Sequence, residues 1–372
     1  MRRPPRRGSP PLWTRSGPRL ARRDLLLGAL LVLMALAAYA QVYGGDYGRA
    51  DGRVAANPGF IWDDEDYVFE NPHLPDPGGL ERIWFHPRES PQYYPLVFTT
   101  FWLEYRLWGG PDEQGRIKAN GYHLTNVLLH ALNALLLWVL FRRLRLRAAW
   151  AVAAVFALHP FCVESVAWVT ERKNVLSLFF YLLAALALLR WEARSGPGRW
   201  GWWGLGLGLF LLGLFSKTVI ASLPLALLIA RWWRGERVTS AYALALAPFL
   251  ALGFAMGRMT AAHERDLVLW GDTGPYWDLG FLDRVLIAGR ALWFYVGKIL
   301  WPHPLVFNYR RWTIDAGDPL QWLWPLAALA ALGALLWIAR RGRRGPLAAG
   351  LFYAVTLFPA LGFVNVAPMR FS

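Results

Sequence analysis

The chain of 372 residues is 56% hydrophobic and 17% charged. Soluble domains carry about 25% charged residues, so this composition argues against a soluble domain and indicates a membrane protein. The net charge of +15 would suit nucleic-acid binding, but the basic residues fall in short patches between apolar runs, which excludes a single basic face. The one cysteine, Cys162, excludes an internal disulfide and a CxxC metal site, and its apolar run predicts a small buried hydrophobe.

The N-terminus predicts a basic cytoplasmic tail followed by a first membrane span. The first 23 residues contain eight arginines and no acid, and an apolar stretch follows at 25–43. This stretch is long enough to cross a hydrocarbon core of about 30 Å. Because basic residues stay on the cytoplasmic side, we expect residues 1–24 to lie inside and the first helix to be retained.

The later apolar runs predict an all-α polytopic membrane protein, a bundle of about nine to ten transmembrane helices within residues 25–365. The runs after the first lie near 120–141, 149–169, 174–190, 201–216, 218–233, 240–257, 285–300, 320–339 and 346–365. Basic clusters at 142–147, 190–199, 231–237 and 340–344 are expected on the cytoplasmic side. The run 285–300 breaks the alternation and contains Arg290 and Lys298, so we expect an interfacial or broken helix there.

The connection 44–119 is too long for a passive turn, and it carries 13 acidic and seven basic residues. The topology predicts that it is a large first extracytoplasmic loop. Within it, the aromatic stretch 93–108 predicts an amphipathic helix lying at the membrane surface. The alternative is a core helix of a small external subdomain.

Four consecutive acids, Asp63, Asp64, Glu65 and Asp66, follow the first span and are flanked by aromatic residues. Sugar transfer to a hydroxyl needs a base that accepts the proton of the acceptor, and partial desolvation near a membrane raises the pKa of a carboxylate toward that task. A divalent cation could also bridge such acids. The alternative is a solvated acidic turn.

Polar groups interrupt the apolar run from His159 to Asn174. Charges at such depth are expensive and so indicate function. Arg172 and Lys173 would lie at the outer end of a span, near a lipid phosphate, although snorkelling to the interface is an alternative. His159 and Glu164 are further candidates; their spacing does not fit a zinc site, and His159 is expected to cap a broken helix before Pro160.

Lys217 stands between two apolar runs and is expected at an outer corner, where a phosphate would be a suitable partner; the alternative is snorkelling to lipid headgroups. The chain stops at 366–372, just after an outward-running span. We read these residues, with Arg370 as a further candidate, as the start of an extracytoplasmic region that continues in a longer protein or in relatives.

Six stretches in this order resemble the membrane portion of the tetratricopeptide-repeat O-mannosyltransferase-like proteins, within the GT-C glycosyltransferases that include the protein O-mannosyltransferases. They are FIWDDEDYVFENPHL (60–74), YYPLVFTTFWLEYRLWG (93–109), GYHLTNVLLHALNALLLWVLFRRL (121–144), HPFCVESVAWVTERKNVLSLFFYLLA (159–184), FSKT (215–218) and PMRFS (368–372). The resemblance implies a GT-C-type bundle with its catalytic acids in the first external loop. Asp63 and Asp64 match that acidic pair, with Glu65 a weaker neighbour, while Arg172 and Lys217 match basic positions that would hold the donor phosphate.

The resemblance implies an inverting transfer of a mannose-like hexose from a polyprenyl-phosphate donor to a protein Ser or Thr hydroxyl. The sequence departs from relatives at Lys173 and Asn174, where they often carry a small residue and an acid, and in having no tetratricopeptide repeats after Ser372. The acceptor therefore stays open, and the alternatives are a lipid or cell-envelope glycan acceptor, a non-catalytic scaffold, or a lipid-phosphate transporter. The Arg-, Ala- and Trp-rich composition favours a bacterial inner membrane with the site facing the periplasm. No cofactor is implied, and a divalent cation is compatible.

Overall fold

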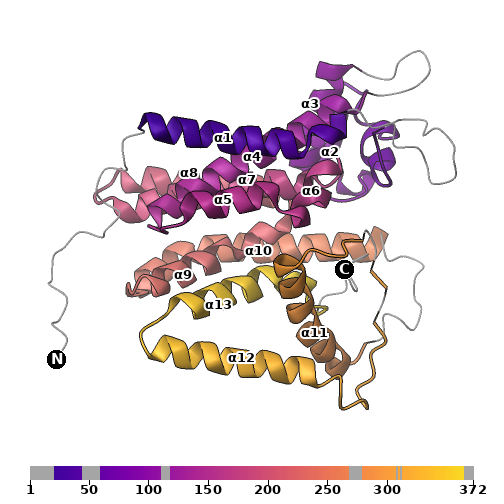
Figure 1. Ribbon diagram of the computed structural model, residues 1–372. Coiled ribbons are helices and arrows are strands. Elements are labelled where there is room, and N and C mark those ends of the chain that lie inside the picture. Colours follow the sequence, from indigo (N-terminus) through magenta and orange to yellow (C-terminus); the bar gives the residue numbers. More distant parts are fainter. Residues whose placement is uncertain are drawn as a thin grey trace. The chain divides into compact units, whose positions relative to one another are not determined.

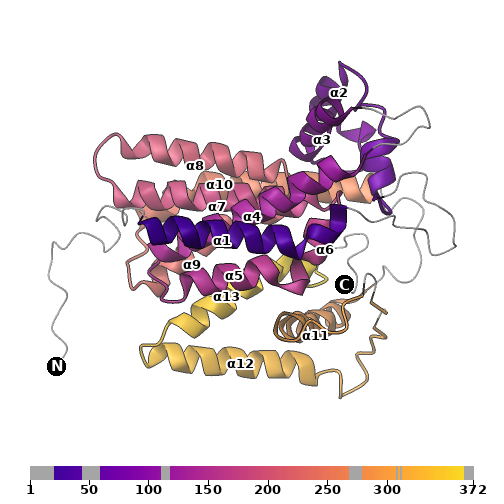
Figure 2. The ribbon, with the colours of Figure 1, turned by 45° about the horizontal axis from the view of Figure 1, so that its top comes forward.

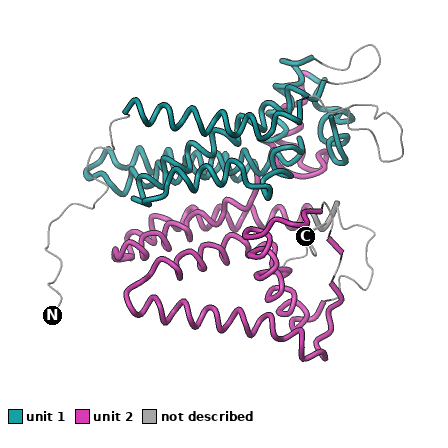
Figure 3. The backbone as a smooth tube through the Cα atoms, in the orientation of Figure 1, with its two compact units in different colours: residues 1–76, 96–216 teal, residues 77–95, 217–372 magenta. Residues whose placement is uncertain are grey.

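A computed structural model describes residues 21–43, 59–109, 118–267, 279–306, 309–310 and 312–363. All regular elements among these residues are helical, which confirms the all-α prediction (Figure 1). The chain divides into two compact units, residues 1–76 with 96–216 and residues 77–95 with 217–372 (Figure 3). The predicted tail 1–24, apart from its last four residues, and the predicted C-terminal region 366–372 lie outside the described residues.

The first unit is a bundle around α4. Its long helices lie side by side, with α4 packed against α1, α5 and α7, and α7 packed against α8 (Figure 2). The helices are α1 (Arg22–Ala38), α3 (Pro95–Trp108), α4 (Asn120–Arg143), α5 (Ala149–Leu158), α6 (Val163–Ala167), α7 (Arg172–Ala193) and α8 (Arg199–Leu214). Single helical turns lie at Ala40–Tyr43, Glu65–Phe69 and Pro160–Cys162.

Small residues allow the helices of this bundle to approach closely. Four buried alanines from α1, α4 and α5 form one cluster: Ala35, Ala131, Ala134 and Ala157. Between α7 and α8, a Cβ at Gly206 would lie 2.8 Å from Cδ2 of Leu188, so only glycine fits this crossing without a shift. Small interface residues are typical of membrane bundles, where packing replaces the hydrophobic effect as the driving force between helices.

The helix predicted at 149–169 is broken in the middle. Its two halves, 149–158 and 160–167, are bent by 55° at the break. Pro160 lacks an N–H and disfavours helical backbone at the residue before it. The Nδ1 atom of His159 accepts a hydrogen bond from the N–H of Phe161 at 3.2 Å, which confirms the predicted capping role of His159.

The second unit contains α2 (Gly79–Phe85) and short turns at Pro87–Glu89, Thr218–Ser222 and Phe358–Ala360. Its long helices are α9 (Leu223–Trp233), α10 (Ser240–Leu267), α11 (Phe281–Leu300), α12 (Leu323–Arg340) and α13 (Gly345–Leu357). Within it, α12 packs against α11 and α13, and α13 packs against α9. A Cβ at Gly289 of α11 would lie 2.6 Å from the backbone nitrogen of Pro325, so a glycine is required where α11 meets α12.

Four helices among the described residues are long and apolar enough to cross a membrane, and the bent pair makes up to five. They are Asn120–Arg143, Arg172–Ala193, Ser240–His263 and Leu323–Arg340. The chain is thus a membrane protein with helices at all ten predicted runs. The count of nine to ten spans, the boundaries of the loop 44–119 and the interfacial placement of 93–108 and 285–300 stay predictions.

Candidate functional site

The acidic motif begins with a strained backbone at Trp62. This residue has φ of 47°, in the left-handed region that a bulky side chain rarely adopts. Its side chain is 57% exposed, and its indole stacks on Trp168 with ring centroids 6.3 Å apart. The Nε1 atom of Trp168 donates a hydrogen bond to the carbonyl of Ile61 at 3.2 Å, which holds this turn against the segment before α7. Strain of this kind gathers at functional sites, where the surrounding contacts maintain it.

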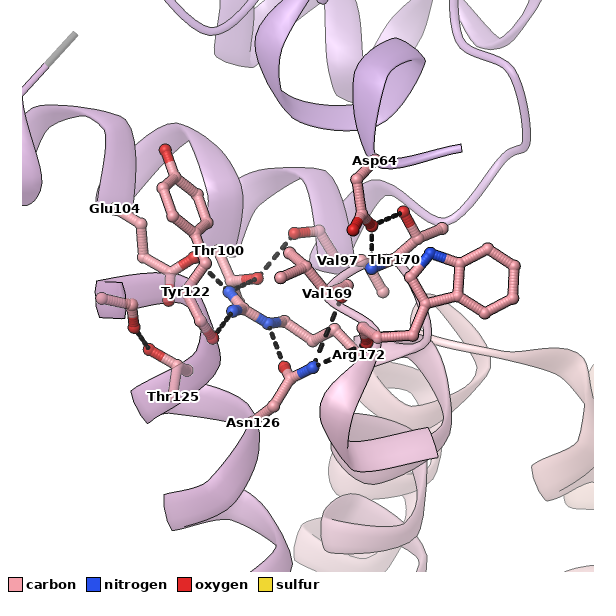
Figure 4. A network of polar contacts seen from close by, with 12 residues as sticks. Asp64, Val97, Thr100, Glu104, Tyr122, Thr125, Asn126, Val169, Thr170 and Arg172 are labelled. Atoms are coloured by element: carbon pink, nitrogen blue, oxygen red, sulfur yellow. Dashed lines mark hydrogen bonds and ion pairs between the residues drawn. The ribbon is translucent and has the colours of Figure 1, made fainter. Parts of the chain in front are cut away.

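Asp64 anchors the motif to the rest of the first unit. Its Oδ1 atom accepts hydrogen bonds from the backbone N–H of Thr170 at 2.7 Å and from the Thr170 hydroxyl (Figure 4). Its Oδ2 atom accepts from the N–H of Ile61 at 3.0 Å. The side chain is fully buried, and this burial raises the pKa of Asp64 to about 6, although the hydrogen bonds oppose the rise. Both carboxylate oxygens are therefore already engaged.

Asp63 is placed differently from its neighbour. It is half-buried, and no described residue donates a hydrogen bond to its carboxylate. Burial raises the pKa of Asp63, Lys173 opposes the rise, and the negative charges of Asp66 and Glu171 add to it. A carboxylate with a raised pKa and free oxygens is suited to accept a proton.

Beside Asp63 lies a buried ion pair at the start of α7. The Nζ atom of Lys173 is 2.8 Å from Oε1 of Glu171, and both residues are 8% exposed. Lys173 also lies over the ring of Tyr67, 5.6 Å from its centroid. The Nδ2 atom of Asn174 donates to Oε2 of Glu171 and, at 3.0 Å, to the Ser165 hydroxyl. The structure thus brings Asp63, Asp64 and Lys173 together within the first unit.

Arg172 is fully buried in a separate polar network (Figure 4). Its Nε atom donates to Oδ1 of Asn126 at 2.8 Å, and Nη2 donates to the carbonyl of Tyr122 at 2.7 Å. Its Nη1 atom donates to the Thr100 hydroxyl at 3.2 Å and forms an ion pair with Glu104. The side chain is 0% exposed, so its donors face the protein in this structure.

This network ties three helices to the segment that holds Asp64. Glu104 comes from α3 and Asn126 from α4, while Arg172 begins α7. The Nδ2 atom of Asn126 also donates to the carbonyl of Trp168 at 3.0 Å. Burial raises the pKa of Glu104, and Arg172 opposes the rise. Sequence reasoning missed Glu104 and Asn126. The signal for Glu104 was a single acid on the buried side of an aromatic helix.

The other predicted site residues lie apart from this cluster or at its edge. Glu65 is exposed beside Asp64. Glu164 is exposed near the start of α6, and His159 lies at the break before it. Their predicted roles in the site stay predictions.

Lys217 belongs to the second unit, where it is half-buried and directly precedes the turn Thr218–Ser222. Arg370 lies outside the described residues. Within the part of the chain that the structure describes, no group of three or more His, Cys, Asp or Glu residues could hold a metal ion.

The curated proteins that are similar to this chain include several protein O-mannosyl-transferases. The chain is 32% identical over 181 residues to Protein O-mannosyl-transferase Tmtc2 of Drosophila melanogaster, a match that covers 44% of this chain and 19% of that protein. The chain resembles the protein O-mannosyl-transferases. It is also 28% identical over 201 residues to TMTC4 of Homo sapiens, covering 48% and 23%, and 30% identical over 149 residues to TMTC3 of Mus musculus, covering 37% and 15%.

These matches confirm the resemblance predicted from the motifs. They span about a fifth of the length of the curated relatives. No family model matches the chain, and no solved structure matches it.

Proposed function

We propose that this chain is a membrane glycosyltransferase that moves a hexose from a polyprenyl-phosphate donor to an acceptor hydroxyl, with Asp63 as the general base. The observation that carries the proposal is the contrast between two adjacent acids. Asp64 has both oxygens bonded within the protein, whereas the carboxylate of Asp63 accepts no hydrogen bond from a described residue and lies near Lys173. The printed names of the relatives support a mannose-like sugar and a protein acceptor.

The proposed reaction is a single displacement with inversion. Asp63 takes the proton from a Ser or Thr hydroxyl of the acceptor as the hydroxyl oxygen attacks the anomeric carbon. The bond between this carbon and the phosphate oxygen breaks, its electron pair leaves with the polyprenyl phosphate, and the new glycosidic bond forms on the opposite face. Because the phosphate is a good leaving group, the step needs little acid assistance, and cations that stabilise its charge are the main electrostatic requirement.

We assign the cations different roles. Lys173 is proposed to contact the donor phosphate, which its place beside Asp63 supports. The phosphate contact of Lys217, matched by resemblance, stays a prediction. Arg172 is proposed to act mainly by position, since its guanidinium is buried among protein acceptors. Its direct contact with the phosphate, matched by resemblance, stays a prediction. A divalent cation near the acids stays open.

Trp62 gives further support to a sugar-binding site. Its exposed indole is next to Asp63 and stacks on Trp168, so it offers an apolar face to a pyranose ring. An aromatic face beside a base is a common arrangement for small polar substrates that need orientation. The proposed setting is a bacterial inner membrane with the site facing the periplasm, and the proposed acceptor-binding partner is a tetratricopeptide-repeat region after Ser372.

Chemical rescue tests the assignment of the base. The full chain in membranes is incubated with a radiolabelled polyprenyl-phosphate hexose, and label entering protein and lipid is counted separately. We expect Asp63→Ala to lose transfer and to recover part of it with added formate, because a small carboxylate can occupy the half-buried space. Asp64→Ala should lose transfer without rescue, since its loss loosens the turn.

Helix content and limited proteolysis at the motif give the folding control. The Asp63→Ala chain should keep the wild-type cleavage pattern, whereas the Asp64→Ala chain should be cut faster between residues 59 and 74. Wild-type transfer by Asp63→Ala or by Asp63→Asn would remove this acid from the mechanism. Label found only in lipid would favour a lipid or glycan acceptor over protein.

A further inference from the structure

A second cluster of charge lies where α7 ends and α8 begins. The guanidinium carbons of Arg190 and Arg194 lie 4.8 and 5.5 Å from the ring centroid of Trp202. On the other side of the turn, the guanidinium carbon of Arg199 lies 4.9 Å from the ring centroid of Trp191. Arg199 also lies over Trp200, 5.3 Å from its ring centroid, so three cations gather on three indoles in the first unit, in a segment that the proposed transfer does not use.

This charge is not neutralised within the described residues. None of Arg190, Arg194 and Arg199 forms an ion pair or hydrogen bond there with a described acid. Arg143, at the end of α4, lies close enough to Arg190 to repel it. The Nε atom of Arg199 is buried and has no hydrogen-bond partner among the described residues. A buried donor without a partner is unfavourable, and so is a pair of adjacent cations, so the cluster favours an anion.

The position of the cluster favours a lipid phosphate as that anion. Two candidate spans end at this cluster, α4 at Arg143 and α7 at Ala193. The ends of membrane spans lie at the depth of the headgroups, where tryptophan is enriched. A guanidinium stacked on an indole still presents its N–H groups at its edge, in a fork that matches the oxygens of a phosphate. Arg190 and Arg194 are exposed, and Arg199 is half-buried.

We propose that Arg190, Arg194 and Arg199 form a binding site for the phosphate headgroup of an anionic phospholipid. Trp202 and Trp191 stack on the guanidinium planes. The N–H edges of the three guanidinium groups bind the headgroup at the turn between α7 and α8. The site is separate from the acidic motif and carries no chemical step. Its effect is to fix the ends of α4, α7 and α8 in one leaflet.

Native mass spectrometry of the full chain in neutral detergent tests this proposal, with isotopically labelled phosphatidylglycerol as the probe and phosphatidylcholine, which is zwitterionic and has no net charge, as the comparison. We expect the variant with Arg190, Arg194 and Arg199 all changed to Gln to bind phosphatidylglycerol about 100-fold more weakly, because each basic residue near an anionic lipid contributes roughly a fivefold factor in affinity. The triple change to Lys keeps the charge and loses the fork, so its affinity should fall between the two.

The matched control removes three charges from a basic turn that an acid already neutralises in part, by changing Arg231, Arg234 and Arg237 to Gln, where Glu236 forms ion pairs with Arg231 and Arg234; it should bind as the wild type does. Helix content before titration establishes that each variant is folded, and the single variant Arg194→Gln, in an exposed turn, gives a second test at about a fivefold effect. Equal losses in the two triple variants would overturn the proposal. So would displacement of the lipid by an equal concentration of soluble glycerol phosphate, because the ligand would then be a free phosphate.

Discussion

The buried pair of Glu104 and Arg172 provides the sharpest test of how the candidate site is held together. Both side chains are almost fully buried, and Glu104 is the one carboxylate that forms an ion pair with Arg172 among the described residues. Removing one partner of such a pair leaves an uncompensated buried charge, which costs about 3–5 kcal/mol. We therefore expect Glu104→Gln to lower the free energy of unfolding by about this amount, even though the amide oxygen can still accept a hydrogen bond.

The opposite substitution should differ in its pH dependence. In Arg172→Met the lone Glu104 can take up a proton, and its folded-state pKa, already raised by burial, rises further without the opposing cation. The folded state then binds more protons than the unfolded state above the unfolded pKa of about 4.3. The stability deficit of Arg172→Met should thus be smallest below that pH and grow as the pH rises through the folded pKa. The stability of Glu104→Gln itself should show no such pH dependence from this pair, because the amide does not titrate and the guanidinium remains charged throughout.

The assay is reversible unfolding of the full chain in mixed micelles, followed by helix content at several pH values between 4 and 8. Glu65→Gln, which removes an exposed acid of the acidic motif, is the matched control and should change stability by less than about 0.5 kcal/mol. Equal and pH-independent deficits in Glu104→Gln and Arg172→Met, or a deficit below about 1 kcal/mol for both, would refute the reasoning from a buried ion pair.

Three further outcomes follow from the same structure. The transfer rate should fall as the pH drops through the pKa of Asp63, with a midpoint above the ordinary aspartate value of about 3.9, as measured in a pH profile of label transfer. Thr170→Val removes one donor from Asp64 and should lower the unfolding free energy by about 1.5–3 kcal/mol. Gly289→Ala places a Cβ 2.6 Å from the nitrogen of Pro325 and should lower the thermal midpoint of the second unit.

Each of these outcomes has a control within the chain. Thr170→Ser keeps the hydroxyl and should keep most of the stability that valine loses. Gly297→Ala, on the same helix as Gly289 but facing open space, should stabilise by up to about 1 kcal/mol through helix propensity. In the pH profile, the midpoint of the acidic limb should differ between wild type and Asp63→Glu. If both proteins show the same midpoint, at the ordinary aspartate pKa, the protonation of Asp63 does not control the transfer rate. If Gly289→Ala leaves the thermal midpoint unchanged, α11 and α12 can move apart at a small cost in free energy.

The sequence predicted the helices well because long apolar runs leave the backbone few alternatives in a membrane. It also predicted the break at His159, since Pro160 removes a donor that the helix needs. The bond of Asp64 to Thr170 spans 106 positions of the chain, and no pattern of apolar residues fixes such a contact. The different environments of Asp63 and Asp64 thus became apparent only from the path of the backbone in the structure, including the left-handed conformation of Trp62.

Arg172 also shows that a sequence pattern does not reveal contacts between residues far apart in the chain. A basic residue at the end of a span indicates a lipid phosphate when its neighbours along the chain are considered alone. Its acceptors come from α3 and α4, between 46 and 72 positions away. Glu104 was the residue that indicated a protein partner for Arg172, because an acid among the buried positions of a helix needs a cation nearby.

The two adjacent acids should therefore not be treated as interchangeable members of a catalytic pair. Consecutive side chains of a turn diverge, so one can be buried against the segment before α7 while the other remains accessible. The buried carboxylate of Asp64 fixes the turn through Thr170, and this fixed turn holds Asp63 near Lys173 and Glu171. The Lys173–Glu171 pair then limits how far the pKa of Asp63 can move, because the cation lowers it and the acid raises it. Loss of Asp64 should consequently reduce transfer by displacing the base, whereas loss of Asp63 should remove the base from an intact turn.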